Sequence, residues 1–342
     1  MMRARRRADP QGPPVAIVRA CLRDGGGGSP TAVVDEAGFA GGAAPGDDDR
    51  RRGVPALAGT SHAVFVSAHD DPEGGPAFSL RFFTAEGELP ACGHGTVAAL
   101  AHLAERAGRR HSYRVTLHAG GRVFTGWTAR RQGRAYASFD PGPVELRTPG
   151  AAERDLVLPA LGIPRDATAP GLRVASVGRP RLLVPVRTRS ALRALSPDFA
   201  GLRAACDRLG LLGCYVYSVP TPEGRAAARM FAPSIGVDED IANANSTACL
   251  AAHLAGPGPT ELAVEMGDFL GSPSTVTATV RPGPPGPPGA AGRQRGARGR
   301  HPAAGALRRA GSPAVLRSRR RPGGAARRAA APSLRRACCG PG

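Results

Sequence analysis

Two reactive side chains stand two residues apart in the segment at residues 88–96, which reads ELPACGHGT. The thiol of Cys92 gains nucleophilic character at a helix N-terminus, and the imidazole of His94 titrates near neutral pH. A strand-like run at residues 81–84 leads into this turn, and a helix-forming segment begins at Val97. Because a helix start directs free backbone N–H groups outward, the order suits a small anionic substrate.

A second small-residue helix follows a second polar turn later in the chain. Residues 96–104 (TVAALAHLA) and 247–255 (TACLAAHLA) agree in register at Thr, Ala, His, Leu and Ala. Each segment comes after a strand-like run and a turn. The repeat predicts two equivalent halves, each presenting a helix N-terminus to a shared cleft.

The basic charge lies at the two ends of the chain. The 342 residues carry a formal charge of +19, with 46 basic and 27 acidic residues. Residues 281–342 hold 15 arginines and no acid, residues 1–14 contribute +3, and residues 15–280 therefore carry only 19 − 15 − 3 = +1. A folded part this close to neutral argues against a nucleic-acid partner, and any such role falls to the basic tail.

The cysteine content favours a reducing compartment. The chain has seven cysteines, an odd number without a CxxC pair, which indicates free thiols and a cytoplasmic location more than a disulfide framework. No apolar run approaches the length of a membrane span. We therefore expect a cytoplasmic protein with no membrane segment.

Alternating and helical patterns divide the chain into mixed elements. Strand-like runs occur at residues 15–20, 32–34, 63–66, 78–83, 113–118, 122–128, 135–139, 182–186, 214–219 and 226–231, and helical patterns at residues 97–107, 190–195 and 246–255. This mixture predicts an α+β protein with antiparallel or mixed sheets. The Gly, Asp and Arg residues of 41–53 predict a surface excursion.

Composition also sets the expected domain boundaries. We expect a disordered basic extension at residues 1–14, one domain at 15–145 and a second at 150–280. Residues 281–342 are rich in Arg, Pro and Gly and too poor in apolar side chains to offset their ordering entropy, so they predict a disordered tail.

Several motifs in order resemble the phenazine biosynthesis (PhzF-like) isomerase family. Residues 28–34 (GSPTAVV) resemble Gly-Asn-Pro-x-Ala-Val-Val, with Ser29 in place of Asn. Residues 81–96 fit the family's first active-site segment without a gap, and residues 229–233 (RMFAP) and 236–240 (GVDED) resemble two later motifs. The resemblance implies the diaminopimelate epimerase fold: two pseudo-symmetric domains, each a mixed or antiparallel sheet or open barrel around a central helix. It also implies a homodimer, no metal and no cofactor.

The resemblance assigns catalytic roles to three residues. His62 stands where the family has its proton-moving Glu, and Asp240 corresponds to the family's second acid. His94 is expected to donate to a substrate oxygen or to relay protons. We therefore predict His62, His94 and Asp240 as the catalytic residues.

Six further residues are predicted to hold the substrate. The family's Thr-Gly-Ser-Ala loop, whose backbone cradles a carboxylate, is Asn-Ala-Asn-Ser here. The side chains and backbone of this loop can still bind an anion. The predicted substrate-binding residues are Cys92, Gly93, Gly95, Asn243, Asn245 and Ser246. Cys92 is expected to be a small packed residue, since Ile241 lies about where related epimerases carry their second thiol.

These assignments predict a cofactor-independent isomerase that moves a proton and a double bond in a small unsaturated carboxylic acid of secondary metabolism. Two alternatives stay open. One is a non-catalytic PhzF-like protein that binds a small acid or a partner, and the other is an amino-acid epimerase or racemase. Incorporation of deuterium from the solvent distinguishes the three functions. An isomerase labels a product with a moved double bond, an epimerase labels Cα, and a non-catalytic protein labels nothing.

Overall fold

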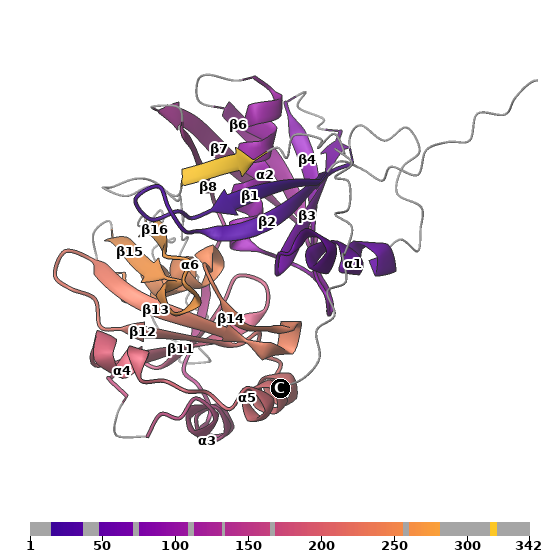
Figure 1. Ribbon diagram of the computed structural model, residues 1–342. Helices are drawn as coiled ribbons and strands as arrows, with labels where there is room; N and C mark the ends of the chain where they lie inside the picture. The colour runs from indigo at the N-terminus through magenta and orange to yellow at the C-terminus, as the bar shows by residue number, and fades with distance from the viewer. Residues whose placement is uncertain are drawn as a thin grey trace, which may run out of the picture.

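The computed structural model describes residues 15–36, 48–70, 75–108, 113–131, 134–164, 168–255, 260–280 and 315–319. These residues form two curled sheets, each wrapped around one helix, and the first half of the chain lies beside the second (Figure 1). The predicted α+β class with two halves is confirmed. No helix in the described part of the chain combines the length and apolar character needed to cross a membrane.

The first sheet closes into a barrel around α2 (Gly93–Arg106). Its strand order is β3-β2-β1-β17-β8-β7-β6-β4-β5, and an additional pairing of β3 with β4 joins the ends. Alanine and glycine dominate α2, so the helix is slim enough to be buried on almost every side. The strands are β1 (Val15–Ala20), β2 (Ser29–Asp35), β3 (His62–His69), β4 (Ala77–Thr84), β5 (Gly87–Leu89), β6 (Tyr113–Ala119), β7 (Arg122–Arg131), β8 (Arg134–Phe139) and β17 (Val315–Arg319).

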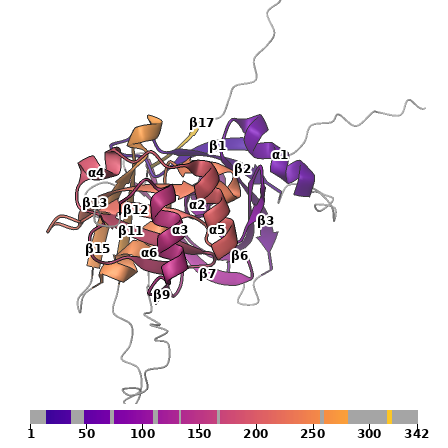
Figure 2. The ribbon, with the colours of Figure 1, turned by 90° about the horizontal axis from the view of Figure 1, so that it is seen from below.

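The second sheet curls around α6 (Ala244–Leu254), the counterpart of α2. Its order is β16-β15-β13-β12-β11-β10-β9, and β14 pairs with β13. The other face packs against α3, α4 and α5, and α3 and α5 lie side by side across it (Figure 2). The elements are β9 (Glu145–Arg147), α3 (Ala151–Ala160), β10 (Arg173–Ser176), β11 (Pro180–Val186), α4 (Arg189–Arg193), α5 (Phe199–Leu209), β12 (Cys214–Ser218), β13 (Arg225–Ala232), η2 (Pro233–Ile235), β14 (Val237–Asp240), β15 (Thr260–Met266), η3 (Asp268–Leu270) and β16 (Ser274–Val280).

Four boundaries differ from those predicted. Both central helices begin earlier than their apolar patterns: α2 starts at Gly93 and α6 at Ala244. Part of the expected surface excursion forms α1 (Asp48–Ala58), which packs Val54 and Ala58 against the outer face of the barrel. The second sheet begins with β9, since Glu145 pairs with Ser176 of β10.

Five residues of the expected disordered tail form a strand. Residues 315–319 pair antiparallel with β1 on one side and with β8 on the other, so their backbone groups bridge two strand edges that no other described strand connects. The prediction of disorder is wrong for these residues, because an open pair of strand edges supplies hydrogen bonds whatever the composition of the strand. The expected extension at 1–14 and the rest of the tail lie outside the described residues.

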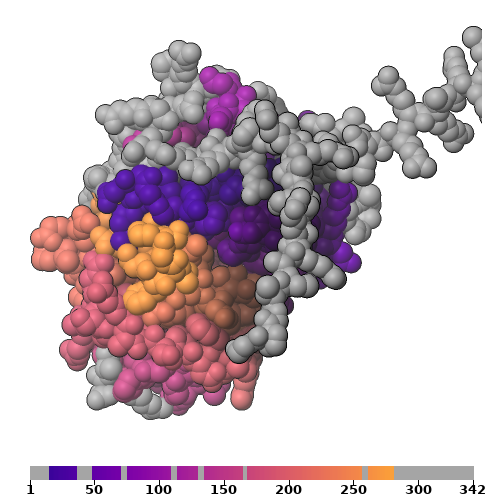
Figure 3. All heavy atoms as spheres, in the orientation of Figure 1, coloured from indigo at the N-terminus to yellow at the C-terminus, as the bar shows by residue number. Residues whose placement is uncertain are grey.

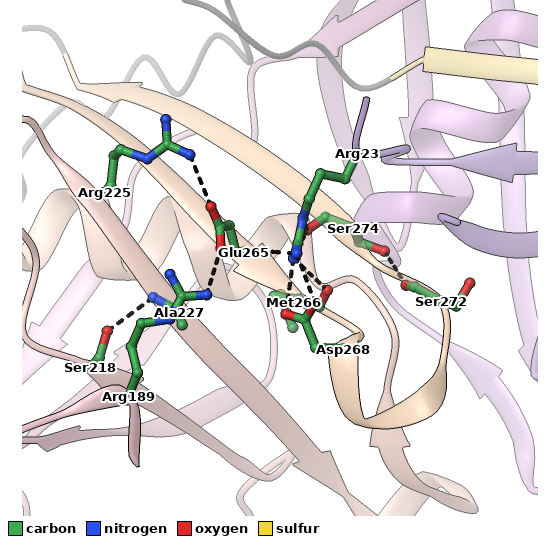
Figure 4. Close-up of polar contacts among 10 residues, drawn as sticks. All are labelled: Arg23, Arg189, Ser218, Arg225, Ala227, Glu265, Met266, Asp268, Ser272 and Ser274. Carbon is green, nitrogen blue, oxygen red and sulfur yellow. Dashed lines mark hydrogen bonds and ion pairs between the residues drawn. The ribbon is translucent and has the colours of Figure 1, made fainter. Parts of the chain in front are cut away.

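A loop of the first half is anchored to the second half. The guanidinium of Arg23 binds Asp268 at 2.7 Å and donates to the carbonyl oxygens of Met266 and Ser274 (Figure 4). The hydroxyl of Ser272 donates to the carbonyl oxygen of Gly28. In the space-filling view, residues of the first strands border β15 and β16 directly (Figure 3). One apolar cluster also runs through both halves, so the two helix starts are held in fixed relative positions.

A buried ion pair fixes the strand that ends at Asp240. Arg229 of β13 forms a two-pronged pair with Glu239 of β14, and the two side chains are only 9% and 8% exposed. The same guanidinium also donates to the carbonyl oxygens of Leu192 and Leu195.

Arg229→Met should therefore lower the free energy of unfolding by about 3–5 kcal/mol, because Glu239 keeps its buried charge without a partner. Urea unfolding measures this change. Arg203→Met is the matched control, since its pair with Glu86 is 45% exposed on both sides and should matter little. Equal effects of the two substitutions would contradict the role given to the buried pair.

Candidate active site

Three elements bring the predicted catalytic side chains together. His62 opens β3, His94 lies in the first turn of α2 and Asp240 ends β14. The two imidazole rings meet edge to face with their centroids 4.4 Å apart, and Nδ1 of His94 lies 3.8 Å from Oδ2 of Asp240. All three are at most 4% exposed. The cluster thus combines two imidazoles from the first half with one carboxylate from the second.

The starts of the two central helices touch beside this cluster. A Cβ placed on Gly93 would lie 2.7 Å from Cβ of Ala244 and 2.8 Å from the backbone nitrogen of Asn245. The space between the two turns therefore admits the hydrogen atom of glycine at position 93 but not a methyl group. The helix starts of both halves therefore face the same small volume, where their unpaired N–H groups favour negative charge.

Asn243 both caps α6 and binds the carboxylate of Asp240. Its Oδ1 accepts from the backbone N–H of Ser246 at 2.9 Å, and its Nδ2 donates to Oδ2 of Asp240 at 3.0 Å. Asn243, which we predicted to bind the substrate, thus already uses its side-chain amide in hydrogen bonds to Asp240 and Ser246. The N–H of Ser246 is taken by the same cap, while its hydroxyl faces the sulfur of Met230.

The remaining predicted ligands line the contact between the helices. Asn245 is 7% exposed at the start of α6, and Cys92 is the residue before α2, without a side-chain cap. Gly95 lets two neighbours approach, since a Cβ there would lie 3.0 Å from both Sγ of Cys92 and the ring of Phe82. His94, expected just before the helix, is instead its second residue, which fixes the direction of its ring.

The two imidazoles have opposite pKa shifts. Burial, reinforced by the positive charge of His94, holds the pKa of His62 well below 6.5. Burial also disfavours the charged form of His94, but the negative charges of Cys92 and Asp240 outweigh it and raise the pKa of His94 to about 10. Burial raises the pKa of Asp240, although His94 and Asn243 oppose the shift. These shifts favour the neutral form of His62 and the protonated form of His94.

Sequence reasoning missed two hydroxyls beside His62. Thr31 pairs with His62 in the parallel ladder of β2 and β3, and Ser29 lies two residues earlier on the same face. Both side chains are 0% exposed, and their oxygens have no hydrogen-bond partner among the described residues. Period-two alternation from the apolar Val33 would have placed them inward, but only the register puts Thr31 opposite His62.

One carboxylate oxygen of Asp240 is also available as a hydrogen-bond acceptor. Its Oδ1 is buried without a well-formed hydrogen bond in the described part of the chain, although the nearby backbone of Ile241 and Ala242 lowers its pKa. Unpaired buried oxygens are rare in folded proteins and often mark a place for a ligand or water. The cluster therefore has unused acceptors on both sides of the imidazoles.

The cavity next to the helix starts is small. It measures about 20 Å³ and is lined by Thr96 of α2 and Asn245 of α6, together with Phe82, Pro90, Ala91, Ala119, Arg122, Phe124, Phe139 and Pro141. This space holds about one water molecule. His62, His94 and Asp240 do not line this cavity.

Comparison with known proteins identifies the family. A model of the family described as phenazine biosynthesis-like protein (PhzC-PhzF) matches residues 20–286. The chain belongs to this family. The resemblance read from the motifs is confirmed, and so is the diaminopimelate epimerase-like fold.

Individual relatives are named as isomerases or epimerases. An uncharacterised isomerase of Escherichia coli (strain K12) is 29% identical over 202 residues, covering 57% of this chain and 65% of that protein. Trans-2,3-dihydro-3-hydroxyanthranilate isomerase of Pseudomonas chlororaphis is 30% identical over 207 residues, covering 58% of this chain and 69% of that enzyme. A solved structure from Pseudomonas aeruginosa, described as a predicted epimerase, matches with a TM-score of 0.65 at 26% identity, covering 78% of this chain and 91% of that one. The match spans about 65% of the length of the Escherichia coli relatives.

Gly93→Ala should test the contact between the helix starts. The added methyl forces the two turns apart, so the free energy of unfolding should fall by about 1–3 kcal/mol, the usual cost of overpacking. Urea unfolding measures it. Gly53→Ala in α1 is the control, since its Cβ would meet nothing within 4 Å and alanine is favoured in a helix interior. A harmless Gly93→Ala would show that the turns are not in tight contact.

The low pKa of His62 predicts a stability loss in acid. An unfolded imidazole takes up a proton near pH 6.5 while buried His62 stays neutral, so lowering the pH below about 6.5 favours unfolding, by up to about 1.4 kcal/mol per pH unit. His94 adds no slope there, because its raised folded pKa makes its contribution constant below pH 6.5 and progressively lost as the pH rises from 6.5 to about 10.

The measurement is urea unfolding of the wild type and His62→Gln at about pH 7.5, 6.5 and 5.5. The difference between the two proteins isolates His62 from the other titrating groups. Identical pH dependence in both would mean that folding does not lower the pKa of His62.

Proposed function

We propose that the protein is a cofactor-independent isomerase that moves a proton and a double bond in a small unsaturated carboxylic acid of secondary metabolism. Membership of the phenazine biosynthesis-like family supports this, and two relatives are named isomerases. The observation that carries the proposal is the contact of two buried imidazoles, with ring centroids 4.4 Å apart, beside a buried carboxylate, and the pKa values of the two imidazoles are shifted in opposite directions. Groups with pKa values driven apart in this way can serve as base and acid.

The reaction follows from these charge states. Neutral His62 takes a proton from a carbon next to a double bond, and the electron pair of the broken C–H bond shifts along the conjugated system. Protonated His94 then gives its proton to the distal carbon, which completes the shift of the double bond. A proton passed from His62 to His94 restores the starting state. Asp240 stabilises the imidazolium of His94 throughout.

The helix starts would hold the carboxylate of the substrate. Gly93, Gly95 and Asn245 lie in the first turns of α2 and α6, where backbone N–H groups lack helical partners. Because His62, His94 and Asp240 are at most 4% exposed, the halves must separate to admit a substrate and close again over it. Closure would exclude water from the carbanion formed in the first step. A homodimer is proposed on the family resemblance alone.

A racemase that uses two thiols has less support. Cys92 is the thiol of the first half, and Ile241 lies at the start of the turn that leads into α6. Cys21 lies near enough to interact with Cys92 and Asp240, but burial and these two negative charges raise its pKa to about 12. A thiol held protonated in this way is a poor base.

Solvent deuterium provides the test. The protein is incubated in D₂O with trans-2,3-dihydro-3-hydroxyanthranilate, with related unsaturated cyclic amino acids and with proline. We expect a product with a moved double bond and one deuterium, detected by mass spectrometry and NMR. His62→Ala should lower this turnover by about 10²-fold or more, the usual scale for a lost general base.

His62→Glu is the matched control, because a carboxylate at this position can also accept a proton and should keep more turnover than alanine. Deuterium confined to Cα would establish the epimerase instead. Binding without label would establish the non-catalytic alternative, and unchanged turnover in His62→Ala would remove His62 from the mechanism.

A further inference from the structure

His62, Cys92 and His94 bring together two nitrogen donors and one sulfur donor. One donor atom from each lies within 4.8 Å of the other two, and all three side chains are buried. The geometry points to a zinc site: we propose that these three residues bind one Zn²⁺ ion. The proposal goes beyond the isomerase reaction and does not depend on it.

The spacing of the donors is close to that around zinc. Bond lengths of 2.0–2.1 Å to nitrogen and 2.3 Å to sulfur place tetrahedral ligands about 3.3–3.6 Å apart. Sγ of Cys92 lies 3.5 Å from Nε2 of His94, within this range. The His62 donor, at up to 4.8 Å, needs to approach by about 1 Å. Such a shift is small for the end of a side chain.

Both imidazoles are oriented as zinc ligands usually are. Nδ1 of His94 donates to the carbonyl oxygen of Ala242 at 2.8 Å, so Nδ1 keeps its proton. Zinc would displace the second proton of His94 and bind the lone pair that this leaves on Nε2. Nδ1 of His62 lies 2.9 Å from the hydroxyl of Ser61, which leaves Nε2 as the candidate donor to the metal. Zinc-bound histidines characteristically use the second ring nitrogen for such a bond, which fixes the ring and its tautomer.

The surroundings can complete the coordination. Three protein ligands leave a fourth position, the arrangement of catalytic zinc sites, which a water molecule or a substrate oxygen can take. Asp240 is within 3.8 Å of His94, and its Oδ1 is an unpaired buried acceptor that a zinc-bound water could satisfy. The unpaired hydroxyl of Thr31 lies on the His62 side.

The identity of residue 62 decides the donor set. The family motif carries a carboxylate here, which would give one nitrogen, one sulfur and one oxygen. His62 changes the set to two nitrogens and one sulfur, which suits zinc better than magnesium or calcium. Zinc would occupy the same lone pairs that proton transfer needs, so the metal-bound protein should not carry out the proposed isomerisation.

The test uses the full-length protein after dialysis against a chelator, with Co²⁺ as the probe. Tetrahedral Co²⁺ bound to a thiolate has a strong near-ultraviolet charge-transfer band and visible d–d bands. We expect these bands to saturate at one Co²⁺ per chain and to be abolished by one equivalent of Zn²⁺. Their absence from folded wild-type protein would overturn the proposal without any variant.

Substitutions then locate the site. Cys92→Ser should abolish the charge-transfer band and His62→Gln the tetrahedral spectrum. Ser61→Ala should weaken Co²⁺ binding by about 10–100-fold, the usual effect of removing the partner of a ligating histidine.

His253→Gln and Cys249→Ser are matched controls for the loss of an imidazole and a buried thiol, and both should bind as the wild type does. Circular dichroism confirms folding of each variant. A spectrum unchanged in folded Cys92→Ser, or lost equally in Cys249→Ser, would overturn the assignment. Because the readout is binding, absence of isomerase activity would leave this result unaffected.

Discussion

The contact between Gly93 and Ala244 is the constraint on which the site depends. Two helices from opposite halves begin within a methyl group of each other, so every polar group at their ends is forced into one small volume. His94 follows Gly93 directly, and Asp240 precedes Ala244 by one short turn. Their proximity is therefore a consequence of packing, and the long interface through Arg23 keeps the halves in this register.

Confinement in this volume also sets the charges. Burial alone would favour the neutral form of every ionisable group, yet interactions with Cys92 and Asp240 raise the pKa of His94 to about 10. Burial, and after it the positive charge of His94, lowers the pKa of His62. The asymmetry between two chemically identical side chains thus results from their distances to one carboxylate and one thiol, as expected where the dielectric is low and neighbours are few. Proton transfer and metal binding are two uses of this single arrangement.

Sequence patterns predicted the parts of the fold that repeat or that carry motifs. The TVAALAHLA and TACLAAHLA segments correspond to α2 and α6, and the motif residues His62, His94 and Asp240 do converge. The exact helix starts could not be predicted, because contact between the two halves extends α2 to Gly93 and α6 to Ala244, ahead of the apolar patterns. The role of Asn243 as a cap, and the inward position of Thr31, depend on register and on a three-residue turn that composition does not encode. Helix α1 was missed because Gly53, Pro55 and acidic residues are poor helix formers, and its packing against the barrel decides the outcome.

The strand β17 ties the last described residues of the chain to the first. Ile17 of β1 pairs with Arg319, so one ladder of the first barrel joins segments separated by almost the entire sequence. A nascent chain emerging from the ribosome could build the second sheet and both central helices before this ladder forms. Until then, the edges of β1 and β8 that pair with β17 would stay exposed. The barrel that contains His62 and His94 would then be sealed last, after the half that supplies Asp240.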